Sequence, residues 1–116
     1  MGNISNKERC LDYLEKYAEK DISAMTEMFA DNITLRDWKI RVKGKEKALS
    51  ETRKNFEAAT SLDIQVLATY ESADTVAAEL KITVNRTEEL YVVDVITFNT
   101  SGEIESIRAY LGRGDD

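Results

Sequence analysis

The chain has 116 residues, with 16 basic and 22 acidic side chains, one cysteine, and neither histidine nor proline. This length predicts a single domain over residues 1–116 with a substantial core. The lone cysteine excludes an internal disulfide, and the lack of histidine excludes a His-dependent triad. Without a cysteine or histidine cluster, no metal and no cofactor are expected. The net charge of −6 argues against nucleic acid or an anionic membrane as a partner.

The N-terminal part of the chain has a helical period. An amphipathic helix is predicted between residues 5 and 20, because apolar side chains recur there at i, i+3, i+4 and i+7: Cys10, Tyr13, Leu14 and Tyr17. Asp21 suits the N-cap of a second, short helix that ends near Ala30. A short strand is expected from Asn32 to Trp38, and a third helix after Gly44.

Beyond the third helix the apolar period changes from 3.6 to 2. Four strands joined by turns are predicted, at Leu62–Tyr70, Val76–Val84, Leu90–Phe98 and Ile104–Leu111. This order of elements indicates an α+β fold with helices on one face of a mostly antiparallel sheet. No apolar run is long enough to span a membrane, and the first twenty residues are too charged for a signal peptide, so a cytoplasmic location is expected.

Asp94 is the acid that departs most clearly from its surroundings. Its neighbours on the same strand face are all apolar: Leu90, Val92, Ile96 and Phe98. Burial disfavours the ionised carboxylate, so Asp94 is expected to be protonated near neutral pH unless a cation pairs with it. Pairing with Arg108 or Lys81 on a neighbouring strand is the alternative.

Asp37 and Tyr13 are the other two candidate catalytic residues. Asp37 ends the strand that carries Ile33 and Leu35, where a half-buried carboxylate can act as a base. The alternative is an acid that is solvated or caps a turn. Tyr13 and Tyr17 are either core residues or hydroxyl donors, and three aromatic residues either pack in the core or wall a pocket: Phe29, Trp38 and Phe56.

Taken together, these positions resemble the nuclear transport factor 2-like superfamily, and within it the ketosteroid isomerases and SnoaL-like polyketide cyclases. The segment from Tyr13 through Arg36-Asp37 is similar to the isomerase segment from catalytic tyrosine to catalytic aspartate. Residues 90–110, with Val92-Val93-Asp94-Val95 and Gly102-Glu103-Ile104, are similar to the strand pair that carries the second aspartate. The resemblance implies a cystatin-like, cone-shaped sheet wrapped around three N-terminal helices, with an apolar pocket between them.

In the isomerases, the residue matching Asp37 moves a proton, and those matching Tyr13 and Asp94 hydrogen-bond the dienolate oxygen. The resemblance therefore implies catalytic roles for these three, with a substrate-binding wall from Phe29, Trp38, Phe56, Val92 and Leu111. Trp38 replaces a proline that commonly follows the family's base, and nearby Lys39, Arg41 and Lys43 predict a more basic pocket entry.

The resulting hypothesis is a cofactor-independent isomerase or cyclase that moves a proton on a small apolar carbonyl compound. A different hypothesis is a non-catalytic module of the same fold that binds a small ligand or supports assembly. In either case a homodimer is expected, because the outward face of the later strands still carries Tyr91, Val93 and Val95.

Overall fold

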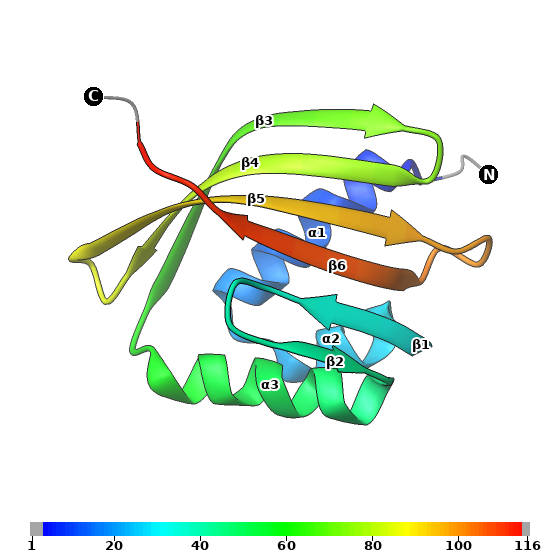
Figure 1. The fold of residues 1–116 in the computed structure, drawn as a ribbon, viewed down its shortest axis with the longest axis horizontal. Helices are drawn as coiled ribbons and strands as arrows, with labels where there is room; N and C mark the ends of the chain where they lie inside the picture. Colours follow the sequence, from blue (N-terminus) through cyan, green and yellow to red (C-terminus); the bar gives the residue numbers. More distant parts are fainter. Residues whose placement is uncertain (1–3, 115–116) are drawn as a thin grey trace.

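The computed structural model describes residues 4–114 and confirms the α+β class. Three helices pack against one side of a curved six-stranded sheet, which Figure 1 shows from its outer side. Within the described residues, no helix is both long and apolar enough to cross a membrane. The elements follow one another as α1 (Asn6–Ala18), α2 (Ile22–Met28), β1 (Phe29–Arg36), β2 (Arg41–Lys43), α3 (Lys45–Ala58), β3 (Leu62–Ser72), β4 (Thr75–Val84), β5 (Glu88–Phe98) and β6 (Ile104–Leu111).

Helices α1 and α2 begin at side-chain caps. The Ser5 hydroxyl accepts from the backbone N–H of Glu8, and the Glu8 carboxylate accepts in return from the Ser5 backbone. This reciprocal pair satisfies two N–H groups that the first helical turn otherwise leaves unpaired. Asp21 is the N-cap of α2, as its sequence position predicts, and its carboxylate accepts from Ala24 N at 3.0 Å. The two helices therefore begin where the sequence signals them.

The strand order in the sheet is β2-β1-β6-β5-β4-β3. Neighbouring strands are antiparallel except β1 and β6, which run parallel although α3 and four strands lie between them in the sequence. The hairpin of β3 and β4 and the turn to β5 follow the predicted meander, and Asn85 and Arg86 adopt positive φ in that turn. The sheet stays open and curved, so its concave side can enclose the helices (Figure 1).

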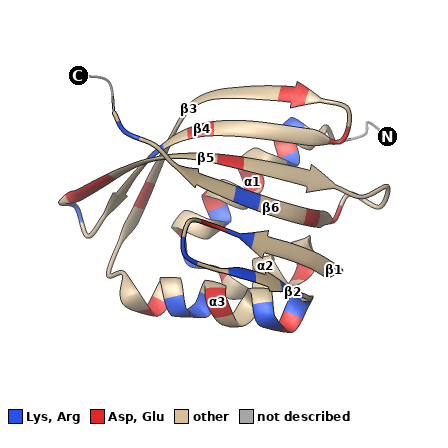
Figure 2. Cartoon of the chain, viewed as in Figure 1, with Lys and Arg blue, Asp and Glu red and all other residues tan. Residues whose placement is uncertain are grey.

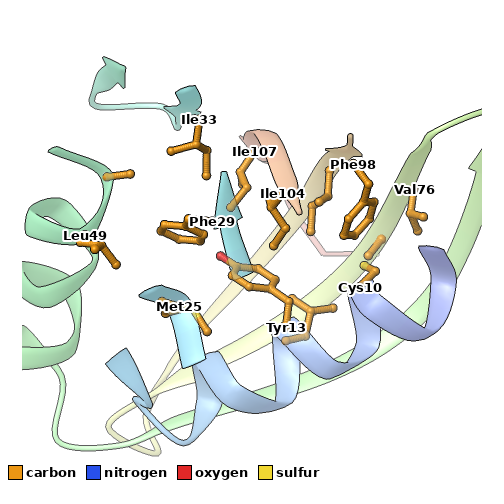
Figure 3. Close-up of a cluster of buried hydrophobic side chains, with 14 of the residues drawn as sticks. Cys10, Tyr13, Met25, Phe29, Ile33, Leu49, Val76, Phe98, Ile104 and Ile107 are labelled. Carbon is orange, nitrogen blue, oxygen red and sulfur yellow. The ribbon is translucent and has the colours of Figure 1, made fainter. Parts of the chain in front are cut away.

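The hydrophobic core lies between the helices and the concave side of the sheet. Figure 3 shows α1 contributing Cys10 and Tyr13, α2 contributing Met25, and the strands facing them with Phe29, Ile104 and other apolar residues. Most of these side chains are fully buried. Because large apolar groups contribute about 1.5–3 kcal/mol each on burial, this layer holds the helices on the sheet and fixes one wall of the interior.

The structure corrects two expectations and adds one strand that the sequence did not predict. The second helix ends at Met28 and β1 begins at Phe29, because Phe29 pairs with Ile104 of the distant β6. The short strand β2 is not predicted, because three residues are too few to show the apolar alternation of a strand. In β3, a bulge between Val66 and Ala68 adds one residue and reverses the later side chains. Ala68 and Tyr70 consequently face outward, and Tyr70 is 58% exposed.

Candidate active site

A cavity of about 540 Å³ lies between α1, α3 and the concave side of the sheet. Its inner walls are largely apolar, with side chains from β1, β3, β4, β5 and β6: Leu35, Ile64, Leu80, Val92 and Ile107. Three of the residues on its walls are Tyr13, Asp37 and Asp94. An enclosed apolar space with a few polar groups is the usual form of a small-molecule site.

Asp94 projects from the middle of β5 toward this cavity. Its partners in register are Ala78 on β4 and Ala109 on β6, whose side chains are small. Asp94 is nevertheless only 9% exposed, and its burial raises the pKa of the carboxyl from 3.8 to about 7. A carboxyl with this pKa carries its proton through much of the range below neutrality and can then donate a hydrogen bond.

Neither of the cations considered as partners for Asp94 reaches it. Lys81 forms an ion pair with Glu89 at 3.1 Å, and Arg108 is exposed, in register with Val95 rather than Asp94. Among residues 4–114, no hydrogen bond or ion pair to the Asp94 carboxyl is found. The desolvation of this acid is therefore not offset by a neighbouring positive charge.

Tyr13 belongs to a row of four aromatic rings. Its ring centre lies 6.4 Å from that of Phe29 and 5.8 Å from that of Tyr17, and Tyr17 meets Phe56 edge-on at 4.9 Å. Burial, together with the nearby Asp94, raises the pKa of Tyr13 well above its ordinary value of 10.0. Tyr13 therefore stays protonated and is a hydroxyl donor on the cavity wall.

Asp37 lies just beyond β1, in the turn to β2. Its Oδ1 accepts from the backbone N–H groups of Lys39 at 2.7 Å and Ile40 at 2.9 Å. Asp37 N also donates to the Ile40 carbonyl at 2.9 Å. The turn-capping role considered for Asp37 is thus present, and it occupies only one carboxylate oxygen. Because Asp37 also lines the cavity, the capped turn holds the carboxylate at the cavity wall.

The remaining predicted wall residues separate into two groups. Val92 and Trp38 line the cavity, and Trp38 is 43% exposed at its open side. Phe29, Phe56 and Leu111 are not part of the cavity lining. Phe29 and Phe56 are buried in the core, where they support the rings of Tyr13 and Tyr17, and Leu111 is 47% exposed at the end of β6.

The entry carries charges of both signs. Lys39 and Lys54 line it together with Glu51 and Glu88, and Lys54 pairs with Glu51 at 2.8 Å. Figure 2 shows basic residues along β2 and both signs alternating along α3. Of the three basic residues expected at the entry, Lys39 lines the cavity, whereas Arg41 and Lys43 do not, and acids from α3 and β5 line it as well. Among the residues with described structure, no three acidic or cysteine side chains gather closely enough to hold a metal ion.

Asn55 is a cavity residue that the sequence pattern did not single out. It lies on α3, and its Nδ2 donates to the Tyr17 hydroxyl at 3.2 Å. Tyr17 also lines the cavity, so it is more than the core residue that its helical spacing suggests. The available signal was position: Asn55 follows Thr52 by three residues and adjoins Phe56, and both of these belong to the buried stripe of α3.

A curved, open sheet wrapped around helices, with an acid-bearing apolar cavity inside, defines a nuclear transport factor 2-like fold. The chain belongs to the SnoaL-like domain family, whose model matches residues 11–107. The match runs from within α1 to the first half of β6 and therefore covers all three of the predicted catalytic positions. A search of curated proteins gave no match.

Solved structures with the same fold include proteins with different assignments. An NTF2-like protein of unknown function from Cytophaga hutchinsonii is 16% identical, with TM-score 0.80 and coverage of 96% of this chain and 93% of that one. SalBIII, an epoxide hydrolase/cyclase-like enzyme in pyran ring formation in the polyether salinomycin, is 26% identical, with TM-score 0.80 and coverage of 92% and 90%. A protein from Kribbella flavida, provisionally described as a ketosteroid isomerase, is 13% identical, with TM-score 0.80 and coverage of 96% and 80%.

Proposed function

We propose that this protein is a cofactor-independent isomerase or cyclase that moves a proton on a small apolar carbonyl compound. The observation that carries the proposal is Asp94, a buried acid without a cationic partner that opens into an apolar cavity also lined by Tyr13. Two neutral donors in such a setting suit an oxygen that gains negative charge during reaction. Asp37, on the wall of the same cavity, supplies a carboxylate base.

In the proposed isomerisation, the free Oδ2 of Asp37 removes a proton from the carbon next to the carbonyl. The electron pair of the broken C–H bond is delocalised into the carbonyl group. The substrate becomes a dienolate, and its oxygen carries negative charge. Tyr13 and neutral Asp94 donate hydrogen bonds to that oxygen, which lowers the barrier to proton removal. Asp37 then returns the proton to a different carbon of the conjugated system, so the enzyme ends unchanged and no external oxidant or reductant is needed.

The relatives share the fold and differ in the reactions that their names describe. SalBIII, at 26% identity, is named as epoxide hydrolase/cyclase-like and for pyran ring formation, which is compatible with a cyclase. The Kribbella flavida protein is described as an isomerase, and at 13% identity it supports the fold alone. The cavity of about 540 Å³ is within the size range of sites for drug-sized ligands.

The direct test is proton transfer on β,γ-unsaturated ketones with one, two and four rings. Conversion to the conjugated ketone is followed by ultraviolet absorbance, and deuterium uptake from heavy water by mass spectrometry. Asp37→Asn keeps an oxygen to accept from Lys39 N and Ile40 N, so it removes the base while the turn remains. Tyr70→Phe is the matched control, because Tyr70 bonds Glu79 on the outer face. Equal rates in the wild type and Asp37→Asn would exclude the proposed base.

A ligand-binding module without catalysis is the second candidate, and the turn-capping role of Asp37 favours it. The bonds to Lys39 N and Ile40 N give this carboxylate a structural function that needs no reaction. The same ketones separate the two candidates. Saturable binding with no deuterium uptake on any ketone would support the module and contradict the enzyme.

We also propose that the protein forms a homodimer through the convex face of the sheet. This face has no helix over it in residues 4–114 (Figure 1). It carries Tyr91, Val93 and Val95 on β5 and Tyr110 on β6, of which Tyr110 is 43% exposed. Their register partners on this face include Glu79, Lys81 and Arg108, so the apolar side chains lie among charged ones. A second copy that covers the apolar side chains stabilises them.

A further inference from the structure

Tyr17 and Asn55 form a second polar pair on the cavity wall, separate from Tyr13 and Asp94. Tyr17 lies one helical turn beyond Tyr13 on α1, and Asn55 lies on α3. Their hydrogen bond of 3.2 Å joins two helices across the cavity wall. Tyr17 is half-buried and Asn55 is exposed, whereas Tyr13 and Asp94 are buried. The cavity thus has a polar pair toward its open side and another at its inner side.

The outer pair keeps hydrogen-bonding groups that the described residues do not use. The Tyr17 oxygen accepts from Asn55 Nδ2, so its own O–H proton remains to be donated. Asn55 retains a second N–H and its carbonyl oxygen, neither of which is bonded to a residue within 4–114. Burial raises the pKa of Tyr17 to about 12, and the bond from Asn55 acts in the opposite direction. Tyr17 therefore remains a neutral donor at physiological pH.

We propose that Tyr17 and Asn55 form a subsite for a second oxygen, and that the ligand is an apolar compound with a carbonyl group at one end and a hydroxyl or carbonyl group elsewhere. The inner pair takes the carbonyl, and the outer pair takes the second oxygen. This inference rests on the proposed function in placing the ligand in the cavity with its carbonyl at the inner pair, and it concerns recognition rather than proton transfer.

Selectivity for a ligand with a second oxygen results from the cost of desolvating that oxygen. A ligand hydroxyl that enters an apolar cavity loses its bonds to water, and this loss weakens binding unless the cavity supplies a partner. The outer pair supplies both a donor and an acceptor. A net contribution of a neutral hydrogen bond corresponds to an affinity gain of about threefold to tenfold. Without the outer pair, the same hydroxyl weakens binding.

The test compares 2-decalone with its ring-hydroxylated derivatives, which are isomers of one another, as probes. Trp38 is the sole tryptophan of the sequence and lines the cavity, so its fluorescence reports occupancy. In the wild type, at least one hydroxylated isomer binds about threefold to tenfold tighter than 2-decalone. Tyr17→Phe and Asn55→Leu lose this preference, and Tyr70→Phe keeps it. The quantity compared is the ratio of the two dissociation constants within each variant, which a general change in fold or stability does not reverse.

Three results would overturn the subsite: no probe binds, no isomer binds more tightly than 2-decalone, or the preference survives in both Tyr17→Phe and Asn55→Leu. Circular dichroism checks that each variant is folded, and Asn55→Leu remains informative if Tyr17→Phe is not, because Asn55 is exposed. Failure of the proposed function has a different signature. In that case Asp37→Asn leaves deuterium uptake unchanged, whereas the preference for a hydroxylated isomer still depends on Tyr17 and Asn55.

Discussion

Replacing Asp94 with asparagine is expected to change how stability depends on pH. Below about pH 3.8 the carboxyl is protonated in both the folded and unfolded states. As pH rises toward about 7, the unfolded chain releases this proton and the folded protein keeps it. The native state then binds more protons than the unfolded state, so the stability of the wild type falls through this window and levels off above it. Asparagine does not titrate and lacks this decline.

The size of the effect follows from the width of that window. The pKa shift from 3.8 to about 7 spans about three pH units, and each unit corresponds to about 1.4 kcal/mol. Once Asp94 is ionised in both states, it therefore lowers the free energy of unfolding by about 4 kcal/mol. About two of these units lie between pH 5 and pH 7. Relative to the wild type, Asp94→Asn therefore gains about 3 kcal/mol between pH 5 and pH 8.

No neighbouring group is expected to mask this dependence. The titratable side chains that interact with Asp94 come from α1: Cys10, Tyr13 and Tyr17. Burial raises the pKa of Cys10 to about 12 and that of Tyr17 to about 12, and it raises the pKa of Tyr13 well above 10.0. All three stay neutral between pH 5 and pH 8. The flanking residues in register, Ala78 and Ala109, do not titrate.

The assay is urea unfolding of the wild type and Asp94→Asn at both pH values, with a carbon-detected NMR titration of the Asp94 carboxyl. A midpoint near 7 and a relative gain for the variant at the higher pH are expected. If the midpoint lies at or below 3.8 and the variant is destabilised most at pH 8, Asp94 is an ionised, paired carboxylate. That result would remove the neutral acid from the proposed mechanism.

Asp37→Asn is expected to lower turnover about 10²-fold to 10⁴-fold with little change in stability; unfolding of the variant would instead identify Asp37 as a structural residue. Val95→Lys on the convex face is expected to yield a folded monomer where the wild type sediments as a dimer, and a wild-type monomer at tens of micromolar would contradict the dimer. Gly102→Ala is expected to cost about 1–2 kcal/mol in urea unfolding, because Gly102 has φ +81°. An unchanged midpoint would show that this turn relaxes without cost.

The strands of the second half of the chain were predictable because each buries one face. Along β5, Val92, Asp94, Ile96 and Phe98 are buried as their alternation indicates. The same pattern identified Asp94 as a buried acid, since a carboxyl in a buried position stands out against apolar neighbours. In β3 the alternation predicts the wrong face for the residues after Val66, because a bulge inserts one residue without a change in composition.

The cavity lining was harder to predict because it depends on contacts between distant elements. Aromatic composition alone did not separate Trp38, which lines the cavity, from Phe29 and Phe56, which pack behind the two tyrosines. Asn55 contributes to the cavity wall through a hydrogen bond to Tyr17 on another helix. The sequence around either residue does not predict such a bond. The structure was therefore needed to distinguish residues that face the cavity from those that support it.

The parallel pairing of β1 with β6 has a consequence for the order of folding. Asp37 follows β1 near the start of the chain, whereas Ile107 and Ala109 come from β6 near its end, and all three line the cavity. During synthesis, the hairpin of β3 and β4 can form early because its contacts are local. The cavity closes only when the last strand docks between β1 and β5. The nascent chain must therefore be extended through β6 before it can hold a ligand in the cavity.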